Sequence, residues 1–136
     1  MDTEGAVAPE TTEAVRERFD DLAPAAATVT SEVARAVLDA DDYDDRVTDD
    51  VVARAHEAIF AAQLRVHVGS RDEYDDWLAD RDVETVELGS DNVDNVAWHY
   101  APFADTVVAA TFSAQREAAV ETLRRQAMGR LYAEVV

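Results

Sequence analysis

The sequence predicts a single α+β domain, in which N-terminal helices precede a small β-α-β-β-β-α unit whose single-layered sheet packs on helices. Two patterns lead to this prediction. Apolar residues recur at helical spacing up to residue 62 and then alternate at strand spacing from residue 66. The predicted strands and helices are also partly segregated along the chain, which is typical of α+β folds. With 136 residues the chain fits one core, because single domains commonly reach about 150–200 residues.

Three helices are expected before the first strand. Residues 1–9 are expected to form a flexible leader, and the domain is expected to span residues 10–136. The threonines at 11 and 12 open the first helix, Pro24 opens the second and Thr48 caps the third. The predicted buried faces are Val15, Phe19 and Leu22; Val29, Val33, Ala36, Val37 and Ala40; and Val52, Ala55, Ile59 and Ala62. An acidic connector, residues 39–45, joins the second helix to the third.

The second half of the chain reads as strands around a short helix. Val66 and Val68 belong to a first strand, and the capping box Ser70-x-x-Glu73 opens a helix. Further strands are expected at residues 83–88, around 96–100, and at 106–112, the last as a buried central strand. Ser113 is expected to cap a final helix.

Charge is the most unusual feature of the composition. Thirty Asp and Glu residues face twelve cationic residues, all of them Arg, so that the net charge is −18. Such self-repulsion destabilises a compact state at ordinary ionic strength, but the Debye length falls to about 3 Å in 1 M salt. The apolar residues are mostly small, with 26 Ala and 19 Val. The sequence therefore predicts a halophilic protein, adapted to multimolar salt.

Several classes of function are disfavoured by what the sequence lacks. There is no Cys for a disulfide, a thiolate nucleophile or a cysteine zinc site. Neither a signal peptide nor an apolar run of about 20 residues is present, so we expect a cytoplasmic protein that does not enter a membrane. A nucleic-acid partner is disfavoured, because Arg124, Arg125 and Arg130 form the only basic group.

No metal, cofactor or catalytic motif stands out. His56, His67 and His99 do not have the spacing of a zinc site. Aligned from Asp39, the acidic connector lacks the Gly and the final Glu of an EF-hand loop. Ser70 has no nucleophile elbow around it, and the four glycines form no phosphate loop. The sequence therefore predicts neither a metal site nor a cofactor, and it favours a non-enzymatic role.

The charge is distributed unevenly along the chain. Residues 1–94 carry 26 acidic residues and eight Arg, whereas residues 95–136 carry four of each. A stretch without carboxylates in such a protein is either the hydrophobic centre of the fold or a surface that contacts a partner.

Two functions remain open from the residues alone. The first is a protein-interaction module that binds a second copy or another protein; its candidate contact residues are Trp98, His99, Tyr100, Phe103, Arg124, Arg125, Arg130 and Tyr132. The alternative is a small enzyme or ligand-binding protein with a pocket between the C-terminal hairpin and the last helix, where His99 and Asp105 supply polar groups. A weaker third hypothesis is an RNA-associated protein that uses the three arginines.

Several segments resemble a known family. They are residues 93–105 (VDNVAWHYAPFAD), 107–112 (VVAATF) and 122–127 (TLRRQA), together with residues 8–11 (APET) and 68–71 (VGSR). The sequence is similar over most of its length to a small haloarchaeal family known only as a domain of unknown function. The resemblance implies a haloarchaeal source, and it implies no activity, cofactor or site residue.

Overall fold

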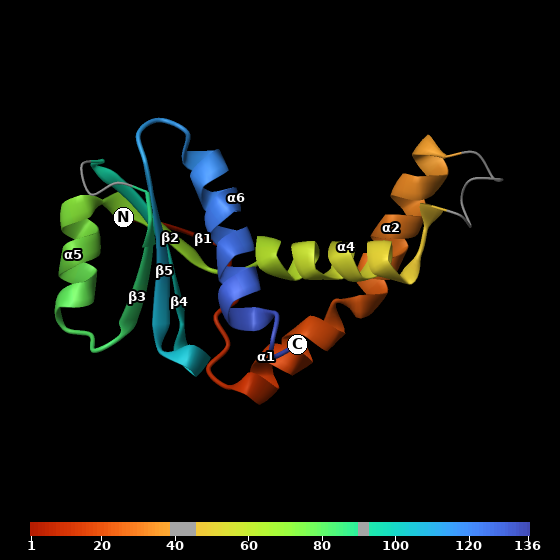
Figure 1. Ribbon diagram of the computed structural model, residues 1–136, viewed down its shortest axis with the longest axis horizontal. Helices are drawn as coiled ribbons and strands as arrows, with labels where there is room; N and C mark the ends of the chain where they lie inside the picture. Colours follow the sequence, from red (N-terminus) through yellow and green to blue (C-terminus); the bar gives the residue numbers. More distant parts are fainter. Residues whose placement is uncertain (39–45, 90–92) are drawn as a thin grey trace.

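The computed structural model describes residues 1–38, 46–89 and 93–136, and it confirms the α+β class (Figure 1). The described strands form one mixed sheet in the order β1-β2-β4-β5-β3. They are β1 (Asp2–Glu4), β2 (Val66–Ser70), β3 (Glu84–Leu88), β4 (Asn95–Ala101) and β5 (Thr106–Phe112). The helices are α1 (Thr12–Asp21), α2 (Ala23–Val37), α4 (Asp49–Ala62), α5 (Arg71–Ala79) and α6 (Arg116–Ala127). Figure 1 shows α5 on one face of the sheet, α6 on the other, and α4 leading away from α6 to α2.

Strands β4 and β5 form the middle of the sheet. They pair as an antiparallel hairpin in which Asn95 lies opposite Phe112 and Ala101 lies opposite Thr106. Strand β3 pairs with β5 in parallel, so that Leu88 lies beside Ala110. Because β5 has a neighbour on both sides and is buried over Thr106–Ala110, the prediction of a buried central strand is confirmed.

Two clusters of buried side chains hold the layers together. The larger cluster lies between the sheet and α6, α4 and α1, and it includes Phe60, Leu64 and Leu123. The smaller cluster lies under α5 and is built around Trp98 and Tyr74. Alternation along β4 sends Val96 and Trp98 to the α5 side, as their spacing predicts.

The N-terminal residues differ from expectation, because they join the sheet instead of forming a flexible leader. Strand β1 pairs antiparallel with β2. Arg116 at the start of α6 donates to Asp2 at 2.8 Å and to Glu4 at 3.0 Å. Val7 is buried, with 4% of its surface exposed. Two carboxylates on one short strand therefore bind one arginine 112 to 114 positions away, a pairing that local sequence patterns do not reveal.

Three of the predicted helix caps are confirmed and one is wrong. Thr11 and Thr48 accept from the backbone of Ala14 and Val51, and Ser70 forms the complete capping box with Glu73. Ser113 does not cap the last helix: α6 begins two residues beyond the predicted start, with Gln115 at its cap position and no side-chain cap bond.

The predicted buried face of α2 is also wrong. The buried residues of this helix are Ala26 and Ala34, whereas Val29, Val33 and Val37 are 49%, 57% and 73% exposed. Small residues rather than valines lie at the centre of the helix contact. Ala40 and the acidic connector 39–45 lie outside the described residues, as do residues 90–92 of the turn after β3.

Candidate functional site

The aromatic residues of the charge-poor C-terminal third lie mostly inside the molecule. Trp98, His99 and Tyr132 have no exposed surface, and Tyr100 and Phe103 are half-buried. A fully buried side chain cannot contact a partner, so the expectation that Trp98, His99 and Tyr132 form a partner surface is wrong. Charge is scarce in this segment because its strands and helix form the hydrophobic centre of the fold.

His99 is a neutral cross-link between β4 and the end of the chain. Its Nδ1 lies 2.6 Å from the carbonyl oxygen of Arg65, and its Nε2 lies 2.6 Å from the hydroxyl of Tyr132. A carbonyl oxygen can only accept, so Nδ1 carries the proton and Nε2 accepts from Tyr132. Burial lowers the pKa of His99 to about 4, and burial also raises the pKa of Tyr132. This arrangement serves stability, since neither group can reach a substrate.

Asp105 lies on the other side of the hairpin from His99. It adopts a left-handed conformation, with φ of 49°, after the turn Pro102–Ala104. Its carboxylate accepts from the Tyr100 hydroxyl at 2.9 Å. Successive strand residues point to opposite faces, so Tyr100 and the carboxylate bonded to it lie away from the α6 face, to which His99 points. The expectation that His99 and Asp105 line one pocket is therefore wrong.

The three C-terminal arginines have different surroundings. Arg124 is half-buried and donates from Nε to the carbonyl of Leu64 at 3.1 Å. Arg130, in the π-helical turn Met128–Tyr132 that follows α6, is exposed and donates to Gln126 near the end of α6, also at 3.1 Å. Arg125 is exposed. Arg124 and Arg125 line a groove between α4 and α6, whereas Arg130 lies outside it.

This groove, which we call the α4–α6 groove, consists of two adjoining hollows of about 430 and 280 Å³. Both hollows are lined by Ala58, Ala61 and Arg125. The larger hollow also includes Glu4, Ala62, Glu117, Val120, Glu121 and Arg124. The smaller hollow also includes Arg54, Glu57, Met128, Gly129 and Ala133. Small apolar residues therefore form much of its surface, with charged side chains of both signs around them.

The groove exists because α4 presents small side chains toward α6. Ala58, Ala61 and Ala62 are spaced at three and four residues, so they share one face of the helix. Their methyl groups leave space that leucine or isoleucine would fill. Sequence analysis found Arg124 and Arg125 but missed Ala58 and Ala61. The sequence signal that could have found them is a row of alanines at helical spacing.

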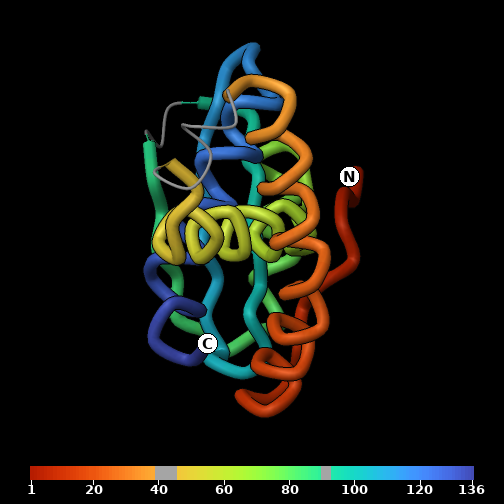
Figure 2. Tube along the Cα trace, turned by 90° about the vertical axis from the view of Figure 1, so that its right-hand side faces the viewer, coloured from red at the N-terminus to blue at the C-terminus, as the bar shows by residue number. Residues whose placement is uncertain are grey.

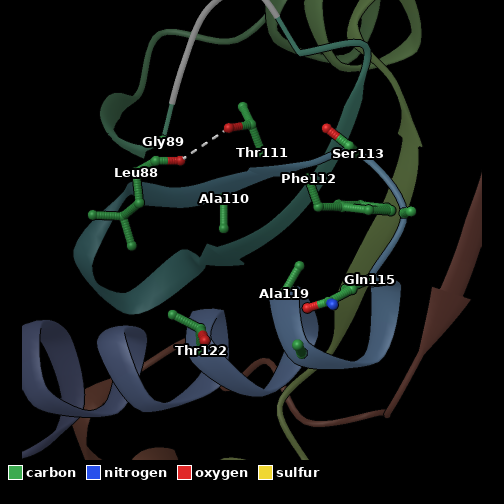
Figure 3. Close-up of a pocket in the computed structure, with 11 residues that line it drawn as sticks. Leu88, Gly89, Ala110, Thr111, Phe112, Ser113, Gln115, Ala119 and Thr122 are labelled. Carbon is green, nitrogen blue, oxygen red and sulfur yellow. Dashed lines mark hydrogen bonds between the residues drawn. The ribbon is translucent and has the colours of Figure 1, made fainter.

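A separate hollow of about 590 Å³, outside the α4–α6 groove, lies between the end of the β3–β5 pair and the first turns of α6 (Figure 3). The residues that line it include Leu88, Gly89, Ala110, Phe112, Ala119 and four with polar side chains, Thr111, Ser113, Gln115 and Thr122. None of its lining residues is charged, although 31% of the chain is. This hollow includes neither His99 nor Asp105, the two polar residues that were expected in a pocket between the C-terminal hairpin and the last helix.

Gly89 allows the close approach of β3 and β5 at this hollow. Its φ is +105°, and a Cβ at this position would collide with the Thr111 hydroxyl oxygen. The Thr111 hydroxyl donates to the carbonyl of Leu88 at 3.5 Å. Only glycine meets both requirements, conformation and space, without strain.

Residues 1–38, 46–89 and 93–136 are the segments that the structure describes. No group of three metal-binding side chains occurs in these segments. None of their helices is long and apolar enough to span a bilayer.

Comparison with known proteins identifies a family whose function is unknown. No curated protein and no solved structure matches the chain. Residues 6–133 match the Family of unknown function (DUF5809). Since this match covers nearly the whole chain, the protein belongs to that family.

Proposed function

We propose that this protein is a non-enzymatic interaction module of a halophilic cytoplasm, and that its α4–α6 groove binds an amphipathic helix of a partner protein. The observation that carries the proposal is the continuous groove floored by Ala58 and Ala61 and bordered by Arg125. Amphipathic helices commonly bind by laying an apolar face into such grooves.

The lining of the groove indicates what its occupant must supply. The alanine methyl groups at the floor fill little space, so the groove is deep there. The bound helix therefore needs large aliphatic or aromatic side chains to fill it. Three arginines and four glutamates line the groove, so the occupant needs charged groups of both signs, with its carboxylates beside the exposed Arg54 and Arg125. Arginine is well suited to this role because its planar guanidinium binds carboxylates with two parallel hydrogen bonds.

The composition supports a haloarchaeal source and a multimolar-salt cytoplasm. A net charge of −18 without a single lysine keeps a surface hydrated at salt concentrations that screen its self-repulsion. Long-range attraction between charges is also screened there. Partner recognition in such a cytoplasm must depend on short-range packing, which is what an apolar groove provides.

Filling the groove should weaken partner binding. We expect Ala58→Leu to lower the affinity for the partner by a factor of about 5 to 150, because overpacking a closely fitted contact costs about 1–3 kcal/mol. The measurement is affinity capture from a lysate of the source organism in 3 M KCl, with bound proteins quantified by mass spectrometry.

Ala53→Leu is the matched control, since it makes the same change at an exposed position of α4 outside the groove lining. The proposal requires a stoichiometric protein that the wild type and Ala53→Leu retain and Ala58→Leu loses. Retention of the same proteins by all three, or of none by the wild type, would contradict it.

The uncharged hollow between the β3–β5 pair and α6 favours a second candidate function, which is the binding of a small neutral ligand. Its volume of about 590 Å³ falls within the range of about 300–1,000 Å³ that is usual for ligand sites. Its lining combines apolar surface with three hydroxyls and one amide and carries no charge. Such a lining suits an uncharged molecule with a few hydrogen-bonding groups.

Ala119→Phe tests this candidate by filling the hollow, with Ala53→Phe as the control at an exposed site. In an NMR screen of neutral fragments in 3 M KCl, we expect ligands that shift the amide signals of Gly89 and Thr122. Ala119→Phe should remove these shifts and Ala53→Phe should preserve them. The candidate fails if no fragment shifts these signals, or if the shifts persist after the hollow is filled.

A further inference from the structure

The α4–α6 groove follows the axis of α6. Its larger hollow is lined by residues of this helix from Glu117 to Arg125, and its smaller hollow by Arg125, Met128 and Gly129. A Cβ at Gly129 would meet no atom within 4 Å, so the groove is open at this end. Helix α2, orange in Figure 2, lies on the side opposite the last residues of the chain and lines neither hollow. An elongated occupant can therefore lie along α6 and extend past Gly129.

The two hollows of the groove differ in the sign of their charge. Three carboxylates and two guanidinium groups border the larger hollow: Glu4, Glu117, Glu121, Arg124 and Arg125. Two guanidinium groups and one carboxylate border the smaller hollow: Arg54, Arg125 and Glu57. The larger hollow, beside the first turns of α6, therefore has an excess of negative charge. The smaller hollow, beside the end of α6, has an excess of positive charge.

Most of these charges are available to an occupant. Glu4 is bound by Arg116 at 3.0 Å, and Arg124 donates to the carbonyl of Leu64 at 3.1 Å. The other charged residues of the groove are exposed and form no ion pair within the described segments: Arg54, Glu57, Glu117, Glu121 and Arg125. An occupant can therefore pair with them without breaking an existing ion pair.

We propose, on the basis of the groove function proposed above, that the bound helix runs antiparallel to α6, with carboxylates in its N-terminal half and basic side chains in its C-terminal half. Glu117, Glu121 and Arg125 follow one another at intervals of four residues, so they share one face of α6. Eight residues separate Glu117 from Arg125, which is about 12 Å along the axis. The acidic and the basic groups of the occupant are therefore about eight residues apart.

The direction of the bound helix follows from the helix dipoles. Groove charges alone require carboxylates beside Arg54 and Arg125 and cations beside Glu117, whichever way the helix runs. A helix is stabilised by acidic residues in its first turn and basic residues in its last turn. Only the antiparallel direction satisfies this preference together with the charges of the groove. It also places the positive end of the bound helix beside the negative end of α6, and the reverse at the other end.

High salt weakens these pairs but does not remove them. Separated charges on an exposed surface are largely screened, whereas partly buried pairs are screened much less. The charged groups of the groove lie at the edge of its apolar floor, so a bound helix covers them in part. The pairs therefore select the order of charge, while the apolar contact supplies most of the affinity.

Two synthetic peptides test the order of charge. Both have about 16 residues, the same composition and leucines at helical spacing for the groove floor. The first carries glutamates in its N-terminal half and arginines in its C-terminal half, and the second has these halves exchanged. We expect fluorescence anisotropy in 3 M KCl to show that the wild type binds the first peptide about fivefold or more tightly than the second.

A charge exchange in the protein separates this effect from the helicity of the peptides, since the second peptide is also the weaker helix. The double variant Glu121→Arg with Arg125→Glu changes two exposed residues. It should shift the ratio of the two Kd values by about fivefold or more toward the second peptide. The matched control is Glu17→Arg with Arg18→Glu, an exposed exchange on α1 outside the groove lining, which should keep the wild-type ratio.

A nitroxide label on the first peptide tests its direction. At the N-terminus of the peptide, the label should broaden the amide signal of Gly129. At the C-terminus, it should broaden the signal of Glu117. Broadening in the reverse order would overturn the antiparallel assignment.

The outcomes distinguish failure of this inference from failure of the groove. Equal binding of both peptides, or a ratio that the exchange at Glu121 and Arg125 does not change, overturns the order of charge. If Ala58→Leu still weakens the binding of both peptides, the groove itself stands. If neither peptide binds, or if Ala58→Leu binds both as the wild type does, the groove and the inference fail together.

Discussion

Transfer of the folded protein from 3 M to 0.1 M KCl is expected to unfold it. The chain carries 30 acidic and 12 cationic side chains. In the described part of the chain, 16 of the 23 buried hydrophobic residues are alanine or valine, and these gain less from burial than larger side chains do. As the Debye length lengthens from below 3 Å to about 10 Å, repulsion among neighbouring carboxylates is restored. Folded proteins are typically stable by only about 5–15 kcal/mol, so the restored repulsion between carboxylates is expected to unfold the chain.

The structure explains why its arginines do little to neutralise this charge. Several of them donate to backbone carbonyls: Arg16 to Val135, Arg65 to Ala6, Arg81 to Trp77 and Arg124 to Leu64. None of these four bonds pairs a carboxylate, and those of Arg16, Arg65 and Arg124 join segments that are distant in the sequence. Arg116, which pairs with both Asp2 and Glu4, is the clearest exception. Salt must therefore provide much of the screening that ion pairs provide in other proteins.

Far-ultraviolet circular dichroism across a KCl titration measures this transition. Sucrose at 1 M without KCl is the control, because it favours burial without screening charge. We expect it to leave the chain largely unfolded. A spectrum that is unchanged between 0.1 and 3 M KCl would contradict the expected salt requirement.

The sequence predicted the elements well where local chemistry determines them. Threonine and serine caps predicted the starts of α1, α4 and α5, and the alternation of apolar residues predicted the strand β4. The parallel pairing of β3 with β5 was not predictable in this way. It depends on a crossover between strands that are not neighbours in the chain, for which no local signal exists.

The candidate sites show where sequence reasoning failed. Aromatic residues are enriched in interfaces but also fill protein cores, and composition alone could not separate the two for Trp98 and Tyr132. For the valines of α2 the error was the opposite one, because residues predicted to be buried are exposed. Helical periodicity identified an apolar face correctly, but it could not tell which part of that face α4 covers. Burial is a property of the tertiary arrangement, and the small residues Ala26 and Ala34 determined it here.

Acidification from pH 7 to pH 4 is expected to destabilise the protein through His99. Burial lowers the pKa of His99 from 6.5 to about 4 in the folded chain. Between these values the unfolded chain binds a proton that the folded chain does not, so stability falls as the pH falls. The stabilisation is fully present above pH 6.5 and is lost by about pH 4. The loss amounts to roughly 3 kcal/mol, at about 1.4 kcal/mol for each pKa unit.

A double variant, His99→Asn with Tyr132→Phe, isolates this contribution. Asparagine can still donate to the Arg65 carbonyl but does not titrate, and phenylalanine removes the hydroxyl that would otherwise lose its acceptor. Carboxylates also take up protons in this pH range, which relieves repulsion in the folded state, so the absolute pH profile contains both effects. The difference between wild type and variant removes the carboxylate part, since both chains share the same acids.

Urea unfolding in 3 M KCl at several pH values gives the free energies, and NMR titration of the histidine ring protons gives the pKa of His99 directly. We expect the stability advantage of the wild type over the variant to shrink by roughly 3 kcal/mol between pH 7 and pH 4. The ring signals of His99 should show a midpoint near 4. Parallel pH profiles, or a His99 midpoint near 6.5, would mean that the ring is open to solvent. The bond to Tyr132 would then not hold the last turn of the chain on the sheet. If both expectations hold, the hydrogen bonds of His99 to Arg65 and Tyr132 stabilise the contact between β4 and the end of the chain by an amount that depends on pH.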